Sequence, residues 1–149
     1  MTDSPLITIG WREVVALPSL SVQSLKVKAD TGAKTSALHA HNVLPVTVDG
    51  RDYVQFGVDC VSTDIWQRHV LPVHAMRSVK NSGGQIDVRY SVETVLSFGG
   101  QEHVIELTLA DRTRMRYDMI LGRRAMRACN MIVDPSRSYL LGKPSSTNG

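Results

Sequence analysis

Apolar and polar residues alternate with a period of two along most of this chain, in short runs separated by turn residues. In residues 102–110, EHVIELTLA, the apolar side chains of Ile105, Leu107 and Leu109 fall on one face. This period is typical of a β-strand with one buried face. Similar runs occupy residues 6–10, 12–18, 24–29, 35–40, 44–48, 52–58, 65–73 and 88–98. The alternation therefore predicts an all-β protein.

Turn signals and one helical stretch complete the predicted layout. The dipeptides Asp49-Gly50 and Gly99-Gly100 stand between predicted strands and are typical of hairpin turns. Residues 123–129, RRAMRAC, contain no Gly, Pro or β-branched residue and predict a short helix. A chain of 149 residues suits one domain, which can bury roughly two thirds of its unfolded surface. We therefore expect a single closed or sandwich-like β domain over residues 1–142 and a frayed tail at 143–149.

Composition excludes several classes of protein. Hydrophobic residues make up 42% of the chain and charged residues 21%, as in an ordinary globular protein. The net charge of +3 is small and the basic residues are scattered, so we expect no nucleic-acid partner. The chain has no run of 18 uncharged apolar residues and no pattern of a secretory signal at its start. We therefore expect no membrane span and a cytoplasmic location. Cys60 and Cys129 have neither disulfide-framework nor zinc-ribbon spacing.

The tripeptide Asp30-Thr31-Gly32 follows the predicted strand 24–29 directly. A strand that ends at an aspartate delivers its carboxylate to a turn, and a glycine there permits a tight turn that brings a backbone N–H close to the carboxylate. The same composition also makes ordinary turns without any chemistry. The tripeptide alone therefore does not decide between a catalytic aspartate and a strand-ending turn.

A second motif, Ile120-Leu121-Gly122, lies 92 positions further along the chain and precedes the predicted helix. Together, ADTGAKTSAL and MILGRRAM resemble the arrangement found in retropepsins, a family of aspartic peptidases. In that family the late segment threads behind the aspartate loop, and its glycine leaves room for the loop. The resemblance implies an all-β acid protease fold, a retropepsin-like closed barrel. Residues 74–90 resemble the flap hairpin of retropepsins, with residues 81–84, Asn-Ser-Gly-Gly, at its tip.

A closer resemblance involves three segments at once. IGWREVVALPSL, ADTGAKTSALHA and LADRTRMRYDMILGRRAM are similar to a bacterial retropepsin-like family long filed as ATP-dependent zinc proteases. Members of that family are associated with the ATP-grasp ligase that adds glutamates to a ribosomal protein. The similarity covers roughly residues 7–135, and three joint segments are more specific than one motif. It implies an aspartic endopeptidase acting on a peptide or protein substrate.

Aspartic peptidase chemistry needs two carboxylates that share one proton, one to take a proton from water and one to protonate the carbonyl oxygen. The chain holds one Asp-Thr-Gly, so a catalytic site requires a homodimer with Asp30 from each subunit. The resemblance implies that Thr31 braces the two loops and that Gly32 donates its N–H to the dyad. It also implies that Ala33, Gly83 and Gly84 contact the substrate, and that Ile120, Leu121 and Gly122 have a structural role beside it.

Lys34 departs from the retropepsin pattern, in which an aspartate often stands at this position and pairs with the arginine that follows the late glycine. That arginine is Arg123 here, and with lysine at position 34 it must find another acid or face the cleft. Lys34, Arg123 and Arg124 would then make the cleft positive, which favours an acidic or glutamate-rich substrate. A solvated lysine on a turn is an equally good interpretation.

The older name of this family mentions zinc and ATP, but the sequence contains no motif typical of binding either one. The chain has no H-E-x-x-H motif, and the candidate ligand pairs are His39 with His41 and His69 with His74. Strand or core histidines explain both pairs, and no P-loop is present, so we expect no metal and no cofactor.

Two alternative functions stay open. One is a metal-dependent peptidase in which His39, His41 and another ligand converge, and the other is a non-catalytic domain that binds an extended acidic peptide by strand addition.

Overall fold

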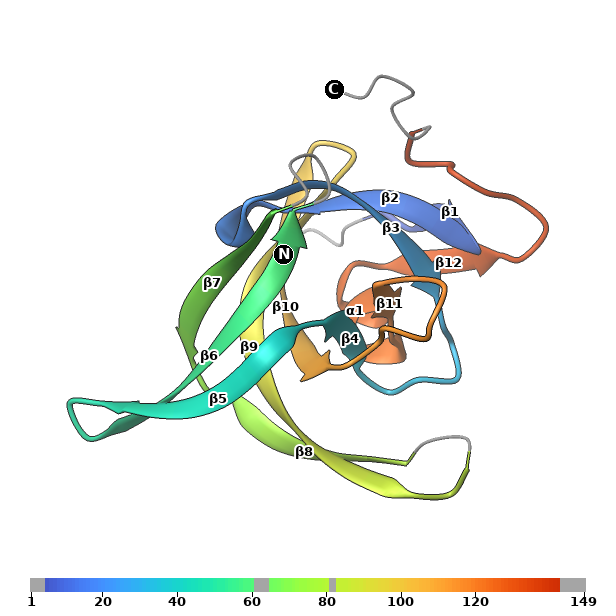
Figure 1. Cartoon of the computed structure of the whole chain (residues 1–149). Helices are drawn as coiled ribbons and strands as arrows, with labels where there is room; N and C mark the ends of the chain where they lie inside the picture. The colour runs from blue at the N-terminus through green and yellow to red at the C-terminus, as the bar shows by residue number, and fades with distance from the viewer. Residues whose placement is uncertain (1–4, 61–64, 81–82, 143–149) are drawn as a thin grey trace.

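The computed structural model describes residues 5–60, 65–80 and 83–142 of the chain (Figure 1). Its elements run in the order β1 (Ile7–Gly10), β2 (Arg12–Leu17), the 3₁₀ turn η1 (Pro18–Leu20), β3 (Val22–Ala29), β4 (Ser36–His39), β5 (His41–Val48), β6 (Arg51–Cys60), β7 (Ile65–Pro72), β8 (Ala75–Lys80), β9 (Ile86–Phe98), β10 (Gln101–Ala110), β11 (Met119–Leu121), α1 (Arg123–Ala128) and β12 (Met131–Asp134). The frayed tail expected at 143–149 lies outside the described residues, as do residues 81 and 82 of the expected flap tip.

Six strands close into a barrel. The hydrogen-bonded order is β10-β4-β11-β3-β2-β9, and antiparallel pairing of β9 with β10 joins the two ends. Strand β8 pairs with the part of β9 that extends beyond the barrel. The predicted all-β closed barrel is therefore confirmed, and so is the short helix predicted after Gly122. In the described part of the chain, no helix combines the length and the hydropathy that crossing a bilayer requires.

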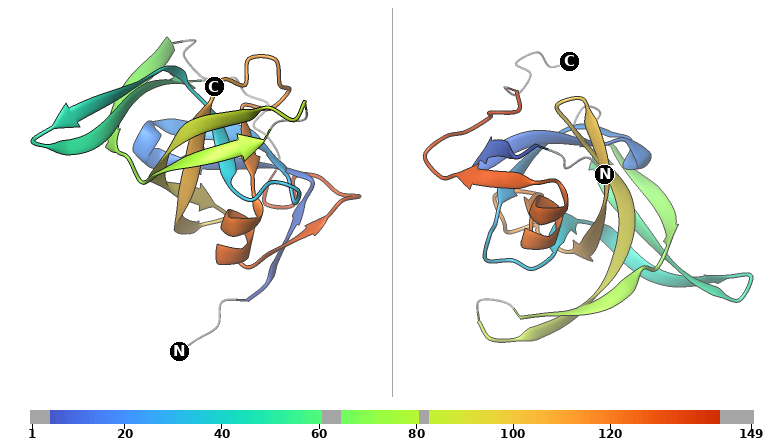
Figure 2. Two further views of the ribbon diagram at one scale, coloured as in Figure 1. Left: turned by 90° about the horizontal axis from the view of Figure 1, so that it is seen from below. Right: turned by 180° about the vertical axis from the view of Figure 1, so that it is seen from behind.

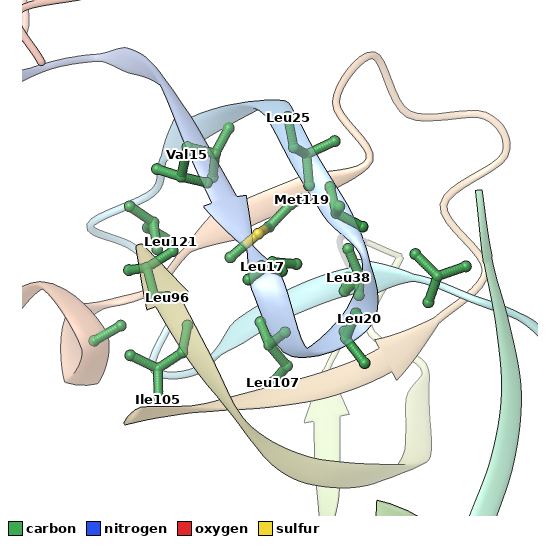
Figure 3. Close-up of a cluster of buried hydrophobic side chains, with 14 of the residues drawn as sticks. Val15, Leu17, Leu20, Leu25, Leu38, Leu96, Ile105, Leu107, Met119 and Leu121 are labelled. Carbon is green, nitrogen blue, oxygen red and sulfur yellow. The ribbon is translucent and has the colours of Figure 1, made fainter. Parts of the chain in front are cut away.

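The barrel surrounds the core that the alternation predicted (Figure 3). Ile105, Leu107 and Leu109 are all buried, and Leu17, Leu38, Leu96, Met119 and Leu121 pack with them from four other strands. Alternation misleads at Val88, which shares a face of β9 with buried Val92 yet is 62% exposed. The reason is that β9 is longer than the barrel, so its first residues continue the same pattern beyond the core.

A separate three-stranded sheet, in the order β5-β6-β7, packs one face on the barrel. Val54, Phe56 and Val58 of β6 are buried in the common core. The predicted turns are both present: Asp49 and Gly50 have φ of 50° and 75°, and Gly99 and Gly100 have φ of 52° and 80°. Positive φ at both central residues matches the right-handed twist of a two-residue hairpin. The hairpins β5–β6 and β8–β9 project from the barrel as two arms (Figure 2).

A buried carboxylate fastens the C-terminal segment to the barrel. Glu13, 1% exposed, accepts hydrogen bonds from the backbone N–H groups of Gly10 at 2.6 Å and of Leu140 and Leu141 at 2.9 Å each. The segment passes so close that a Cβ on Gly10 would lie 2.3 Å from the carbonyl oxygen of Arg137. Parallel pairing of β1 with β12 continues the same attachment. The two ends of the described chain are therefore joined through Glu13.

Replacing Glu13 by alanine should lower the free energy of unfolding by about 3 kcal/mol, because one buried and two half-buried N–H groups would lose their carboxylate acceptor. Urea unfolding of Glu13→Ala checks this. Glu102→Ala removes a carboxylate from the exposed start of β10 and should change stability by less than about 0.5 kcal/mol. Equal effects of the two substitutions would contradict the role assigned to Glu13.

Candidate functional site

Strand β3 ends at Ala29 and delivers Asp30 to a tight turn. The Asp30 N–H donates to the carbonyl of Leu121 at 2.9 Å, and the Ala33 N–H donates to the Asp30 carbonyl at 3.2 Å. The Gly32 N–H donates to the Asp30 carboxylate oxygen Oδ1 at 3.0 Å. Thr31 and Gly32 are exposed and Asp30 is half-buried. The loop therefore presents an oriented carboxylate at the surface of the chain.

The late motif lies directly beside this loop, as the sequence comparison with retropepsins implied. Strand β11 runs between β3 and β4, parallel to the first and antiparallel to the second. The Gly122 N–H donates to the Ser36 hydroxyl at 3.0 Å, and a Cβ on Gly122 would lie 2.5 Å from the carbonyl carbon of Thr35. Only a glycine lets the two backbones approach so closely.

The start of α1 holds the same loop from the other side. The N–H groups of Arg123 and Arg124 donate to the carbonyls of Ala33 and Lys34 at 2.8 and 3.1 Å. The Arg123 guanidinium donates to the Thr31 carbonyl at 3.0 Å. The sequence led us to expect that Arg123 would find another acid or face the cleft, but a backbone carbonyl is its acceptor. The side chains of Lys34 and Arg123 are both exposed.

The hairpin β8–β9 projects below the Asp30 loop in the view of Figure 1. Gly83 and Gly84 near its outer end are exposed, and Gly84 has a φ of 85°. A groove of about 620 Å³ lies between the outer part of β9, the junction of β4 with β5, and the end of β10. His39, His41, Arg89, Tyr90, Asp87 and Asp111 are among its polar lining residues. Asp30 does not line this groove.

Arg112 is buried, and its charge interacts with that of Asp30, but it was not predicted from the sequence as a residue of the site. Its side chain is 8% exposed, its Nε donates to the Tyr117 carbonyl at 3.0 Å, and its charge interacts with those of Asp118 and Asp30. Burial holds the pKa of this guanidinium below its ordinary value, and the neighbouring Arg89 acts in the same direction. Residues 111–118 look like a mixed surface in the sequence, with no local signal that one arginine turns inward.

Among the described residues, one set of three side chains approaches metal-ligand geometry: His39, His41 and Asp59, whose ligand atoms lie within 4.8 Å of one another. His41 Nε2 is 2.9 Å from an Asp59 oxygen. His39, however, accepts the Arg112 N–H at Nδ1, at 2.8 Å, so neutral His39 carries its proton on Nε2. Neither ring nitrogen then has a lone pair available for a metal. The three residues do not fit a zinc site.

His69 and His74, the second candidate pair of metal ligands, do not belong to this group of three side chains. His69 packs its ring against Phe56, with the ring centroids 5.8 Å apart, and burial lowers the pKa of its imidazole. His74 instead lies near the carboxylates of Glu93 and Glu106. Cys129 is buried, which raises the pKa of its thiol to about 11. A thiol in this state is a poor ligand and a poor nucleophile.

Comparison with known proteins agrees with the fold. Residues 8–144 match the model of the RimB-like family, described as "Retropepsin-like aspartic endopeptidase RimB". The crystal structure of a protein of unknown function from Legionella pneumophila subsp. pneumophila str. Philadelphia 1 superposes with a TM-score of 0.76 and 27% identity, over 90% of this chain and 97% of that one.

Longer relatives carry a different name. A protein of Shewanella halifaxensis named "Probable alpha-L-glutamate ligase" is 39% identical over 145 residues, which are 96% of this chain and 31% of that protein. A protein of Parasynechococcus marenigrum with the same name is 38% identical over 138 residues, 91% of this chain and 29% of that protein. The chain thus spans about a third of the length of the curated relatives it matches.

Replacing Gly122 by alanine should destabilise the protein by about 3 kcal/mol, because the new methyl group would collide with backbone atoms that cannot move aside. Chemical unfolding measures the loss. In Gly50→Ala the added Cβ meets nothing within 4 Å, so that variant should lose only about 1 kcal/mol, from the strain of its left-handed turn. A Gly122→Ala protein as stable as wild type would contradict the close backbone contact.

Proposed function

Because this chain belongs to the RimB-like family of retropepsin-like aspartic endopeptidases, we propose that it hydrolyses peptide bonds as a homodimer, with Asp30 of each copy as the catalytic pair. The observation that carries this proposal is the Asp30 loop. Its carboxylate is oriented by the Gly32 N–H, its backbone is held by β11 and α1, and its outer surface is open. A contact like that with the Gly32 N–H also occurs in ordinary turns, as at Asp111 and Asp134, so the support from β11 and α1 is what sets this loop apart.

The chemistry follows from bringing two such loops together. Two carboxylates about 3 Å apart cannot both be ionised, so they share one proton. The ionised carboxylate takes a proton from a water molecule, which attacks the peptide carbonyl, while the protonated one donates to the carbonyl oxygen, and a tetrahedral intermediate forms. The C–N bond of this intermediate then breaks: the carboxyl group that took the water proton gives it to the leaving amine, and the other carboxylate takes back a hydroxyl proton, so that the pair again shares one proton. Gly32 N–H groups orient the pair, and Thr31 braces one loop against the other across the twofold axis. The site is incomplete in one copy, so activity requires the dimer.

The substrate is an extended peptide that lies between the Asp30 loops and the β8–β9 hairpin. Ala33 contacts it from the loop, and Gly83 and Gly84 cover it from the hairpin. The exposed cations Lys34 and Arg123 stand beside the loop and favour an acidic, glutamate-rich peptide. The names of the longer relatives support this choice, because a glutamate ligase makes glutamyl products on which a peptidase of this kind would act.

A second candidate keeps the fold without catalysis, as a domain that binds an extended acidic peptide by strand addition. The groove along the outer part of β9 favours it, because residues 86–90 pair with β8 on one side and lie beyond the strand's pairing with β10 on the other. A metal-dependent peptidase is the weaker alternative, since the tautomer of His39 opposes metal binding.

Asp30→Asn should abolish peptide hydrolysis, lowering turnover at least about a hundredfold, because the pair then lacks its shared proton and its base. Chelators such as EDTA should leave the wild-type rate unchanged. Turnover of peptide mixtures, followed by mass spectrometry, measures both effects. Binding that persists in Asp30→Asn, with no turnover by wild type, would support the non-catalytic domain instead, and loss of activity with EDTA would support a metal.

Glutamate-rich peptides should be cut faster than lysine-rich peptides of equal length, because Lys34 and Arg123 attract the former. In Lys34→Gln this preference should shrink by roughly threefold, as expected for one screened surface charge. Lys26→Gln removes an exposed lysine from β3 outside the loop and serves as the control. Equal cleavage of the two peptide classes by wild type would eliminate the acidic-substrate proposal while leaving the peptidase itself intact.

A further inference from the structure

Charged residues of like sign face each other in two cross-strand pairs, here called rungs, on either side of Ser91 at the root of the β8–β9 hairpin. Arg77 of β8 lies opposite Arg89 of β9, and Glu93 of β9 lies opposite Glu106 of β10. Arg89 and Glu93 are four residues apart on one strand, so both rungs project from the same face. Like charges directly opposite each other destabilise a sheet. Each of these two like-charged pairs is therefore stable only if other residues supply the opposite charge.

One diagonal pair, Arg77 with Glu106, links the two rungs, while Arg89 lies 3.5 Å from an Asp87 oxygen. Arg77 donates to both oxygens of Glu106, with Nε to Oε2 at 2.7 Å and Nη2 to Oε1 at 2.9 Å. The hydrogen bonds with Arg77 are the main reason why the pKa of Glu106 lies below its ordinary value. His74 Nδ1 is 3.7 Å from a Glu93 oxygen. The pair formed by Arg77 and Glu106 thus links the edge strand of the hairpin to a barrel strand that is not its neighbour.

Strand β9 passes from the barrel into the hairpin at Ser91, which lies between the two rungs. Ser91 is buried and pairs with Ala75 of β8 on one side and with Thr108 of β10 on the other. Its hydroxyl donates to the Ala75 carbonyl at 3.3 Å, and its carbonyl accepts the His74 N–H at 2.8 Å. Arg77 reaches across this point to Glu106. A change in the hairpin's angle at Ser91 would separate the two side chains.

The same carboxylate is linked to the Asp30 loop. Arg124 Nη1 lies 3.7 Å from Glu106 Oε1, and the Arg124 N–H donates to the Lys34 carbonyl at 3.1 Å. The Glu106 side chain is only 12% exposed, so these contacts are less screened than those of a surface ion pair. Glu106 therefore contacts the hairpin and the helix that supports the loop.

We propose that Arg77 is a positioning residue whose bidentate pair with Glu106 holds the β8–β9 hairpin at the angle from which it covers the Asp30 loop. The inference deepens the proposed function and rests on it, because a cover matters only where a substrate binds. Arg77 acts through the hairpin and does not touch the reacting atoms. Its loss should loosen the hairpin and weaken substrate binding while leaving the chemistry of the carboxylate pair unchanged.

Hydrogen exchange of backbone amides tests the link without needing activity. In Arg77→Met, amides of β8 and of residues 86–91 should exchange roughly fivefold to tenfold faster, with β2 and β3 unchanged. In Arg77→Lys the exchange rates of these amides should lie between those of wild type and of Arg77→Met, because lysine cannot form the bidentate pair. Lys80→Met removes a positive charge from the same strand and should leave exchange unchanged. Unchanged exchange in Arg77→Met, or an equal change in Lys80→Met, would overturn the inference.

A second variant separates the link from a general loss of stability. Glu106→Gln should give the same local increase in exchange, and the double variant Arg77→Met/Glu106→Gln should be no worse than either single one. If the two substitutions increased exchange additively in the double variant, the inferred role of the pair formed by Arg77 and Glu106 would be overturned. With a peptide substrate, Arg77→Met should raise KM by roughly fivefold and change kcat by less than about twofold. A fall in kcat with unchanged KM in Arg77→Met would count against the inference. A wild-type protein that cuts no peptide would refute the proposed function, and the exchange experiment would then decide by itself whether Arg77 and Glu106 hold the hairpin.

Discussion

The close backbone contact between Gly122 and Thr35 is the constraint on which the rest of the structure depends. It lets β11 lie between β3 and β4, and so completes the barrel next to the Asp30 loop. From that position the chain hydrogen-bonds the loop repeatedly: Leu121 accepts from Asp30, and the N–H groups of Arg123 and Arg124 donate to Ala33 and Lys34. The loop is therefore held by backbone groups, which a change of side chain at its surface does not remove. This explains how lysine can occupy position 34 without loss of the arrangement.

The acceptor of Arg123 illustrates the same point. An aspartate at position 34 would give this arginine an acidic partner, but here the guanidinium reaches the Thr31 carbonyl and still joins helix α1 to the loop. The loop keeps its geometry while the charge beside it becomes positive. The support of the Asp30 loop thus comes from contacts to its backbone, whereas the side chains of Lys34 and Arg123 beside it are exposed. Relatives about three times as long preserve this segment with 38–39% identity, so the same unit also occurs within larger proteins.

Much of the fold was predictable because its signals are local. Alternation in residues 102–110, the dipeptides of the two turns and the helical composition after Gly122 each depend on neighbours in sequence. The pairing of two distant motifs was predictable only through a family resemblance. The attachment of the C-terminal segment by Glu13, the inward turn of Arg112 and the pair formed by Arg77 and Glu106 had no such signal. The contacts of Glu13 and Arg77 depend on partners brought close by tertiary structure, 127 residues away for Glu13 and Leu140 and 29 for Arg77 and Glu106, whereas the Arg112 side chain donates to Tyr117, only 5 residues along the chain. The exposure of Val88 has the same origin, because the end of the barrel is not encoded in β9 itself.

The proposed function requires that the carboxylate of Asp30, which is oriented but solitary in each chain, acquires its chemistry from a second copy. The separation of the two Asp30 carboxylates, in a crystal structure of the assembled protein with a peptide-like ligand, tests this requirement directly. We expect two symmetry-related carboxylates about 3 Å apart, with the ligand carbonyl beside them. Carboxylates that face away from each other across every interface of the assembly, with the ligand bound elsewhere, would contradict it.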